Sequence, residues 1–154
     1  MKIAVIDNYD SFTYNLVHLV NSLTDNEADV YRNDRIDPAR LAGYDGIILS
    51  PGPGIPAEAG LLKDIISEYA GKIPLFGVCL GMQAIAEVFG GTLRNLSAVY
   101  HGVDTDITVK DTSHRIFRDV PAVFKGGRYH SWIVDGNILP ESLLLTAYDN
   151  EGNV

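Results

Sequence analysis

The sequence predicts an α/β fold, with an open and mostly parallel sheet that is covered by helices on both faces. Two observations predict it. Short apolar runs alternate with helix-like segments through the first half of the chain. The links between them are short, which favours strand–helix–strand units with neighbouring parallel strands. The 154 residues are enough for one domain with one sizeable core.

The first strand and the first helix are predicted close to the N-terminus. Lys2 to Asp7 is a short β-branched run, which suits a strand that is buried on both faces. Asp10 or Ser11 can accept a hydrogen bond from the first turn of a helix. Residues 12–23 then show the spacing of an amphipathic helix. Its apolar positions are Leu16, Leu19, Val20 and Leu23.

The following segments continue the alternation up to a pair of glycines at 90 and 91. In order they are a strand at 28–31, a strand at 45–50, a loop at 51–56, a helix at 58–69, a strand at 73–78 and a helix at 82–89. Beyond residue 92 the pattern changes to alternating polar and apolar residues at 104–109 and through much of 122–134. This pattern predicts a partly antiparallel region attached to the same core.

The last segment predicts a strand at 143–148, a turn at 149–153, and a returning strand that would begin at Val154. On this pattern we expect one domain over residues 1–154, whose chain stops before its fold is complete.

Composition excludes several classes of protein. The formal net charge of −8 opposes binding to nucleic acid or to an anionic membrane. One cysteine excludes an internal disulfide and a cysteine-based zinc site, so a reducing compartment fits best. Asp7 comes too early for the apolar core of a signal peptide, and no apolar run is long enough to span a membrane. We expect a cytoplasmic protein.

That cysteine lies in the sequence Gly77-Val78-Cys79-Leu80-Gly81, which has the form of a nucleophile elbow. Such a strand-to-helix turn raises the side chain above the carboxyl edge of the sheet, where open α/β folds bind ligands. The start of a helix favours a thiolate, which predicts a lowered pKa for Cys79. The N–H of Leu80 would stabilise an oxyanion. The alternative is a small buried hydrophobe.

A second loop favours the nucleophile. Ser50-Pro51-Gly52-Pro53-Gly54 ends the preceding strand of the pattern, so it is expected beside the elbow at the same edge of the sheet. Gly52 can bring a bare N–H close to a substrate, and the prolines stiffen the loop.

These motifs make the sequence resemble the class I (triad) glutamine amidotransferases. It is most similar to the glutaminase subunits of anthranilate synthase (component II) and para-aminobenzoate synthase. The residues that carry the resemblance are IDNYDSFTYNL at 6–16, LSPGPG at 49–54, GVCLGMQ at 77–83 and YHS at 129–131. They span most of the chain, and the resemblance implies a flavodoxin-like α/β fold.

The resemblance implies that Cys79 attacks the side-chain amide of glutamine, giving a glutamyl thioester and ammonia for a separate chorismate-binding synthase, component I. Gly52 and Leu80 would form the oxyanion hole. The implied substrate-binding residues are Gly52, Pro53, Gly54, Gln83, Ser131 and Trp132. The segment 8–12 is either a helix cap or part of the surface near the partner. No cofactor is implied, and any magnesium would belong to the synthase.

The family's catalytic base is a histidine in a His-x-Glu pair, which this sequence does not contain. Pro140-Glu141-Ser142 resembles the family's HPES, but it precedes the strand that matches the segment upstream of the catalytic pair. We therefore expect the pair to lie beyond residue 154, and the chain as it stands to be impaired in turnover. His130 is the alternative base.

Four alternatives to the anthranilate synthase glutaminase are considered. The first is the para-aminobenzoate synthase glutaminase, and the second is a non-catalytic glutamine-binding or regulatory module. A nucleotide or phosphate binder is disfavoured, because both G-x-G-x-x-G and the P-loop lysine are missing. A redox-sensing thiol is the remaining alternative.

Overall fold

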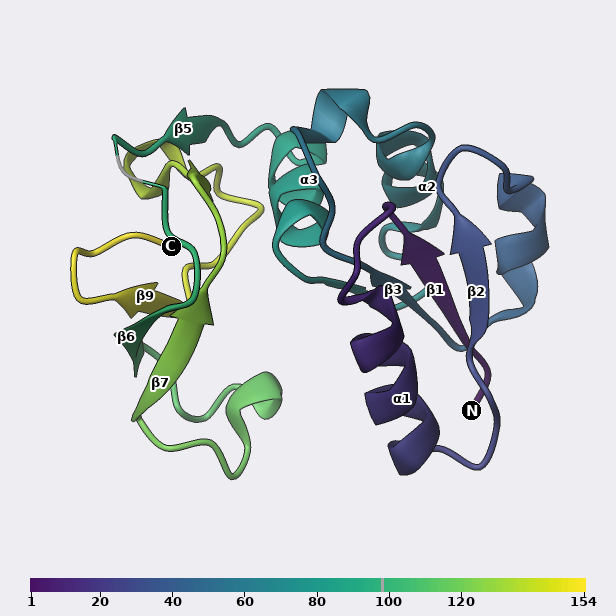
Figure 1. The fold of residues 1–154 in the computed structure, drawn as a ribbon, viewed down its shortest axis with the longest axis horizontal. Coiled ribbons are helices and arrows are strands. Elements are labelled where there is room, and N and C mark those ends of the chain that lie inside the picture. Colours follow the sequence, from purple (N-terminus) through teal and green to yellow (C-terminus); the bar gives the residue numbers. More distant parts are fainter. Residues whose placement is uncertain (98) are drawn as a thin grey trace. The chain divides into compact units, whose positions relative to one another are not determined.

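The computed structural model describes residues 1–97 and 99–154, which form two compact units, Met1–Val88 and Phe89–Val154. Figure 1 shows the elements of each unit. Those of the first unit are β1 (Ile3–Asp7), α1 (Thr13–Leu23), β2 (Asp29–Arg32), β3 (Gly46–Leu49), α2 (Leu62–Tyr69), β4 (Leu75–Gly77) and α3 (Leu80–Val88). Short 3₁₀ turns lie at Pro38–Gly43 and Pro56–Glu58.

The first unit is built on a four-stranded sheet in the order β2-β1-β3-β4, and every strand pair in it is parallel. Ile6 of β1 pairs with Tyr31 of β2 and with Leu49 of β3, and Leu49 pairs in turn with Gly77 of β4. The predicted parallel α/β fold is therefore confirmed. The carboxyl ends of β1, β3 and β4 meet at one edge of the sheet.

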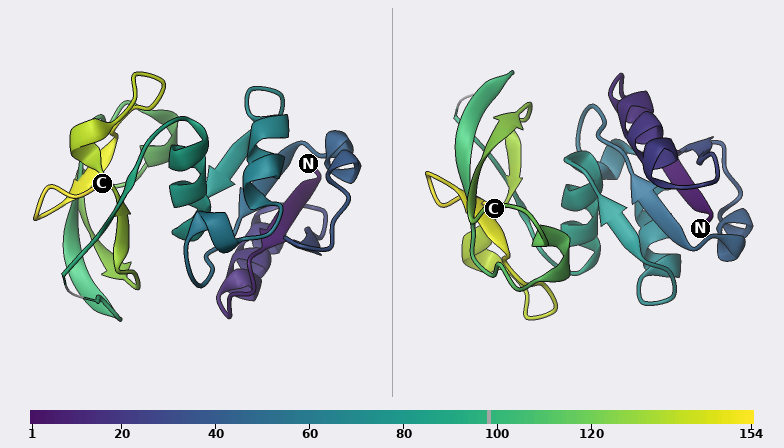
Figure 2. Two further views of the ribbon diagram at one scale, coloured as in Figure 1. Left: turned by 90° about the horizontal axis from the view of Figure 1, so that it is seen from above. Right: turned by 90° about the horizontal axis from the view of Figure 1, so that it is seen from below.

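Helices cover both faces of this sheet (Figures 1 and 2). Ala4 and Ile6 of β1 point into a buried cluster that includes Leu62 and Ile66 of α2 and Leu80 of α3. Because side chains alternate along a strand, residues 3, 5 and 7 point to the opposite face. That face is covered by α1, whose Thr13 Oγ1 donates a hydrogen bond to Asp7 Oδ1 over 2.9 Å.

The first helix differs from its prediction in its start and in its buried face. It begins at Thr13, and the capping position is occupied by Phe12, whose side chain makes no capping hydrogen bond. Asp10 Oδ1 instead accepts from the Phe12 N–H over 2.8 Å, just before the helix. The predicted apolar face was wrong in part, since Leu19 and Leu23 are 58% and 76% exposed.

Two further helix boundaries shift. The predicted helix at 58–69 starts as the 3₁₀ turn Pro56–Glu58 and becomes α-helical only at Leu62. Gly60 separates the two with a φ of +54°, a left-handed conformation that interrupts a right-handed helix. The predicted helix at 82–89 begins earlier, at Leu80.

The second unit contains two small antiparallel sheets, as the alternating pattern predicted. Its strands are β5 (Leu93–Asn95), β6 (Val103–Val109), β7 (Val123–Arg128), β8 (Trp132–Val134) and β9 (Ala147–Asp149), with 3₁₀ turns at Arg115–Phe117 and Gly136–Ile138. β5 pairs with β8, and the other sheet has the order β7-β6-β9. The predicted strand at 143–148 is shorter than expected, because only its end pairs with β6.

None of the helices formed by residues 1–97 and 99–154 combines the length and the apolar character that a membrane span requires.

Candidate active site

Cys79 occupies the turn between β4 and α3 and has a left-handed backbone, with a φ of +51°. Such a conformation is costly for a residue with a side chain, and it persists only where the surroundings fix it. The surroundings here are three backbone hydrogen bonds. Val78 N donates to Leu49 O over 3.0 Å, Gly81 N to Val78 O over 3.0 Å, and Gln83 N to Cys79 O over 2.9 Å. The turn thus has the strained form that the elbow motif predicts.

The thiol of Cys79 is partly buried and has no disulfide partner. The predicted lowering of its pKa was wrong. Burial raises the pKa of Cys79, and the negative charge of Asp10 raises it further. A hydrogen bond from the Leu80 N–H to the sulfur works in the opposite direction, but it does not outweigh burial. Ionisation of Cys79 to a thiolate is therefore opposed by its surroundings, even at the start of a helix.

The loop Ser50 to Gly54 follows β3 directly, at the same edge of the sheet as the turn at Cys79. Gly52 lies against Leu80, because a β-carbon on Gly52 would be only 2.5 Å from Leu80 Cδ2. The two residues expected to form an oxyanion hole are therefore in contact. Their roles stay a prediction.

The other expected site residues of the first unit lie in these same two segments. Pro53 and Gly54 are exposed in the loop, where Gly54 has a φ of +72°. Gln83 is buried in the first turn of α3, and its backbone N–H donates to the Cys79 carbonyl oxygen.

Hydrogen bonds that the sequence did not predict join the start of the loop Ser50 to Gly54 to the residue that follows β1. The Asn8 N–H donates to Ser50 Oγ over 2.9 Å, and Asn8 Nδ2 donates to Ser50 O over 2.8 Å. Asn33 Nδ2 donates to Asn8 Oδ1 over 3.0 Å. A signal was present in the sequence, since Asn8 and Ser50 each follow a buried strand directly.

Ser131 and Trp132 belong to the second unit. The segment they share with His130 accepts backbone hydrogen bonds: Leu96 N donates to Ser131 O over 2.7 Å, and Tyr100 N donates to His130 O over 3.2 Å. His130 Nδ1 lies 3.1 Å from Trp132 O. Because a carbonyl oxygen only accepts, this contact requires a proton on Nδ1. Burial and the nearby Arg128 charge lower the pKa of His130, which favours the neutral ring.

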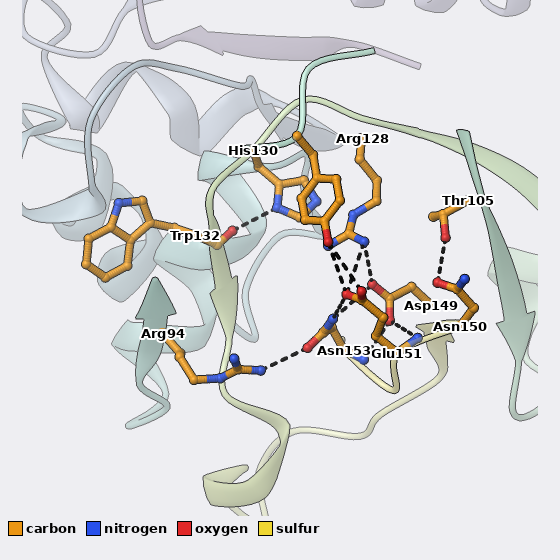
Figure 3. A network of polar contacts seen from close by, with 10 residues as sticks. Arg94, Thr105, Arg128, His130, Trp132, Asp149, Asn150, Glu151 and Asn153 are labelled. Atoms are coloured by element: carbon orange, nitrogen blue, oxygen red, sulfur yellow. Dashed lines mark hydrogen bonds and ion pairs between the residues drawn. The ribbon is translucent and has the colours of Figure 1, made fainter. Parts of the chain in front are cut away.

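A buried ion pair lies next to this segment (Figure 3). Arg128 Nη1 is 3.0 Å from Asp149 Oδ2 and 3.6 Å from Glu151 Oε2. The guanidinium carbon of Arg128 stacks 3.6 Å from the centroid of the Tyr100 ring. Arg94 Nη2 and Asp149 Oδ2 both bond to the side chain of Asn153. This network fastens the turn after β9 to the end of β7.

The structure therefore brings Gly52, Pro53, Gly54, Cys79, Leu80 and Gln83 together within the first unit, and it places Ser131 and Trp132 in the second. His18, which lies on α1, is exposed, as is His101 in the second unit.

Comparison with known proteins gives one family. Residues 4–154 match the sequence model of the family described as Glutamine amidotransferase class-I. The chain is 42% identical over 154 residues to "Anthranilate synthase component 2" of Lactococcus lactis, covering 99% of this chain and 76% of that protein. It is 44% identical over 154 residues to "Aminodeoxychorismate/anthranilate synthase component 2" of Bacillus subtilis, covering 99% of this chain and 78% of that one.

A solved structure of a putative GMP synthase protein from Thermoplasma acidophilum has a TM-score of 0.84 at 26% identity, over 97% of this chain and 73% of that one. These matches agree with the strand-to-helix turn at Cys79 and with the loop Ser50 to Gly54 beside it. The chain belongs to the class-I glutamine amidotransferase family.

Proposed function

We propose that this chain is the glutamine-hydrolysing subunit of an anthranilate synthase in tryptophan biosynthesis, which passes ammonia to a separate chorismate-binding component. The observation that carries the proposal is the match over nearly the whole chain to a protein named anthranilate synthase component 2. The turn at Cys79 supports it, because a thiol on a strained backbone turn at the end of a parallel strand is suited to nucleophilic attack.

In the proposed reaction the Cys79 sulfur forms a bond to the γ-carbonyl carbon of glutamine. The carbonyl oxygen becomes an oxyanion, which would accept hydrogen bonds from the N–H groups of Gly52 and Leu80. The carbon–nitrogen bond then breaks, and the nitrogen leaves as ammonia after it has taken a proton. Water hydrolyses the resulting thioester to glutamate and returns the thiol. No step requires a metal or an organic cofactor.

The residues proposed to hold glutamine are Gly52, Pro53, Gly54, Gln83, Ser131 and Trp132. Proton transfer is the difficult part of this scheme. The sequence contains no His-x-Glu pair, and burial raises the pKa of Cys79. We propose that a polypeptide of these 154 residues is consequently impaired in turnover, since both thiolate formation and protonation of the leaving nitrogen need a positioned acid–base group. The thiol must stay reduced, which fits a cytoplasmic protein.

A second product is the alternative, because the name of the Bacillus subtilis relative includes both aminodeoxychorismate and anthranilate synthase. Aminodeoxychorismate leads to para-aminobenzoate. Only the choice of synthase partner separates the two functions.

The test supplies the chain with the component 1 partner of either relative, together with chorismate and glutamine, and identifies the aromatic product. We expect slow, glutamine-dependent anthranilate formation that disappears in Cys79→Ala, whereas ammonium salts support both samples equally. Binding of glutamine or of component 1, with a γ-glutamyl adduct never detected on Cys79 by mass spectrometry, would instead identify a non-catalytic module. A thiol that reacts with peroxide and ignores glutamine would identify a redox sensor.

A further inference from the structure

Two residues at the carboxyl edge of the sheet, Asn8 and Ser50, hold the loop Ser50 to Gly54 in place. Asn8 follows β1 and Ser50 follows β3, and these strands are neighbours. Asn8 donates twice to Ser50, through its backbone N–H to Oγ over 2.9 Å and through Nδ2 to the carbonyl oxygen over 2.8 Å. The Ser50 hydroxyl in turn donates to Pro51 O over 2.7 Å. The start of the loop is thus bonded to the residue that follows β1.

Burial makes these hydrogen bonds specific. Asn8 is 2% exposed and Ser50 is 0% exposed. The remaining acceptor of the Asn8 side chain, Oδ1, receives a hydrogen bond from Asn33, which is also buried. Both the nitrogen and the oxygen of the Asn8 amide are therefore hydrogen-bonded, which favours one orientation of this buried side chain.

Asn8 also sets the position of Gly52 by direct contact. A β-carbon on Gly52 would be 2.6 Å from Asn8 Cβ and 2.9 Å from Asn8 O, so the glycine backbone packs directly on this residue. Asn8 therefore restrains the loop both at Ser50 and two residues later.

We propose that Asn8, acting with Ser50, is a positioning residue that places the Gly52 N–H for oxyanion stabilisation. This inference rests on the proposed function. It assigns the segment after β1 a part in catalysis, although Asn8 is not proposed to touch the reacting atoms. Loss of the Asn8 side chain should slow reactions of Cys79 that pass through an oxyanion, and it should leave other reactions of the thiol unchanged.

Two reagents separate these cases in the chain as it exists. In γ-glutamyl p-nitrophenyl ester, the Cys79 sulfur bonds to the carbonyl carbon, an oxyanion forms, and the carbon–oxygen bond breaks to release p-nitrophenolate. This leaving group needs no proton, so its departure does not depend on the His-x-Glu pair that the sequence lacks. Iodoacetamide reacts at a saturated carbon and releases iodide without an oxyanion. Both reactions release the thiol proton to buffer, so the ratio of their rates cancels the thiolate fraction.

In Asn8→Ala we expect the acylation rate to fall about 100-fold while the alkylation rate stays within about twofold, since misplacing an oxyanion donor is worth roughly this factor. Ser50→Ala removes one of the two contacts and serves as the second variant if Asn8→Ala does not fold. The matched control is Asn21→Ala. Asn21 is another asparagine of the first unit, and its Oδ1 accepts a hydrogen bond from the Ala28 N–H over 2.8 Å. Both residues are far along the sequence from the loop. A purely structural role would change both rates together.

An unchanged ratio of acylation to alkylation in Asn8→Ala, or in Ser50→Ala if that is the variant that folds, would overturn the inference while the proposed function stood. No Cys79-dependent release of p-nitrophenolate by the unmodified chain would overturn the proposed function, and this inference with it. The two failures are therefore distinguishable.

Discussion

Gly77 and Gly81 lie against each other across the turn that presents Cys79. A β-carbon on Gly77 would meet the Gly81 carbonyl oxygen at 2.6 Å and the Met82 nitrogen at 2.5 Å. Contacts this short with backbone atoms cannot be relieved by rotating a side chain. The close approach of the strand end to the first turn of α3 therefore requires glycine at 77, and this approach holds Cys79 in its left-handed conformation.

We expect Gly77→Ala to destabilise the first unit by roughly 3 kcal/mol, which is the upper range for overpacking a buried site. Thermal or urea unfolding monitored by circular dichroism would measure it. Gly43→Ala is the matched control, because a β-carbon at Gly43 would meet nothing within 4 Å. Equal stability of the two variants would show that the turn can open at little cost.

The charge of Asp10 gives a second prediction. Burial first, and then the Asp10 carboxylate, raise the pKa of Cys79. A negative charge disfavours the thiolate, so Asp10→Asn should lower the pKa and move the pH profile of alkylation by iodoacetamide toward lower pH. Asp25→Asn removes the same charge from an exposed position of the same unit and should leave the profile in place. A profile that shifts equally in both variants would point to net charge rather than to Asp10.

The parallel sheet was predictable because the signals for buried strands are local. The apolar runs before Asp7, Ser50 and Val78 ended within one or two residues of the observed strands. The face of α1 was not predictable in the same way. Leu19 and Leu23 fit the helical period, but which face of a helix is buried depends on what packs on it, and periodicity alone does not say.

The candidate site divides similarly. The positions of Cys79 and Gly52 followed from motifs that fix a turn locally. The raised pKa of Cys79 was missed because burial is a property of the folded unit, and the helix start suggested the opposite sign. The contacts of Asn8 with Ser50 join residues 42 positions apart, so they needed the strand order as well as the sequence.

A third prediction concerns Gly52 itself. In Gly52→Ala the new methyl group would fall 2.5 Å from Leu80 Cδ2 and 2.6 Å from Asn8 Cβ, so the loop must move away from both. Under the proposed function, acylation of Cys79 by γ-glutamyl p-nitrophenyl ester should fall by about 100-fold or more, the usual loss for one oxyanion donor. Gly43→Ala should react normally. Unchanged acylation of Gly52→Ala would show that the Gly52 N–H does not stabilise the oxyanion.

The last prediction concerns the buried pair Arg128–Asp149, whose partners are each 5% exposed. Burial tends to raise the pKa of Asp149, but hydrogen bonds from Asn153 and Glu151 and the charge of Arg128 outweigh it, and the pKa is lowered. A carboxyl group whose pKa is lower in the folded state stabilises the fold above its unfolded pKa of about 3.9, and that stabilisation is lost as the pH falls through the folded value.

Arg128→Met leaves the Asp149 carboxylate buried without its cation, so we expect a loss of about 3 kcal/mol at neutral pH that shrinks below about pH 4. The only tryptophan, Trp132, lies in this unit, so its fluorescence during urea unfolding reports the change. Lys125→Met is the matched control, since the Lys125–Asp106 pair joins β7 to β6 on the surface of the same unit and is worth at most about 1 kcal/mol. If the two variants lost equal stability, or if the loss in Arg128→Met were the same at every pH, the buried pair would not be what fastens the turn after β9.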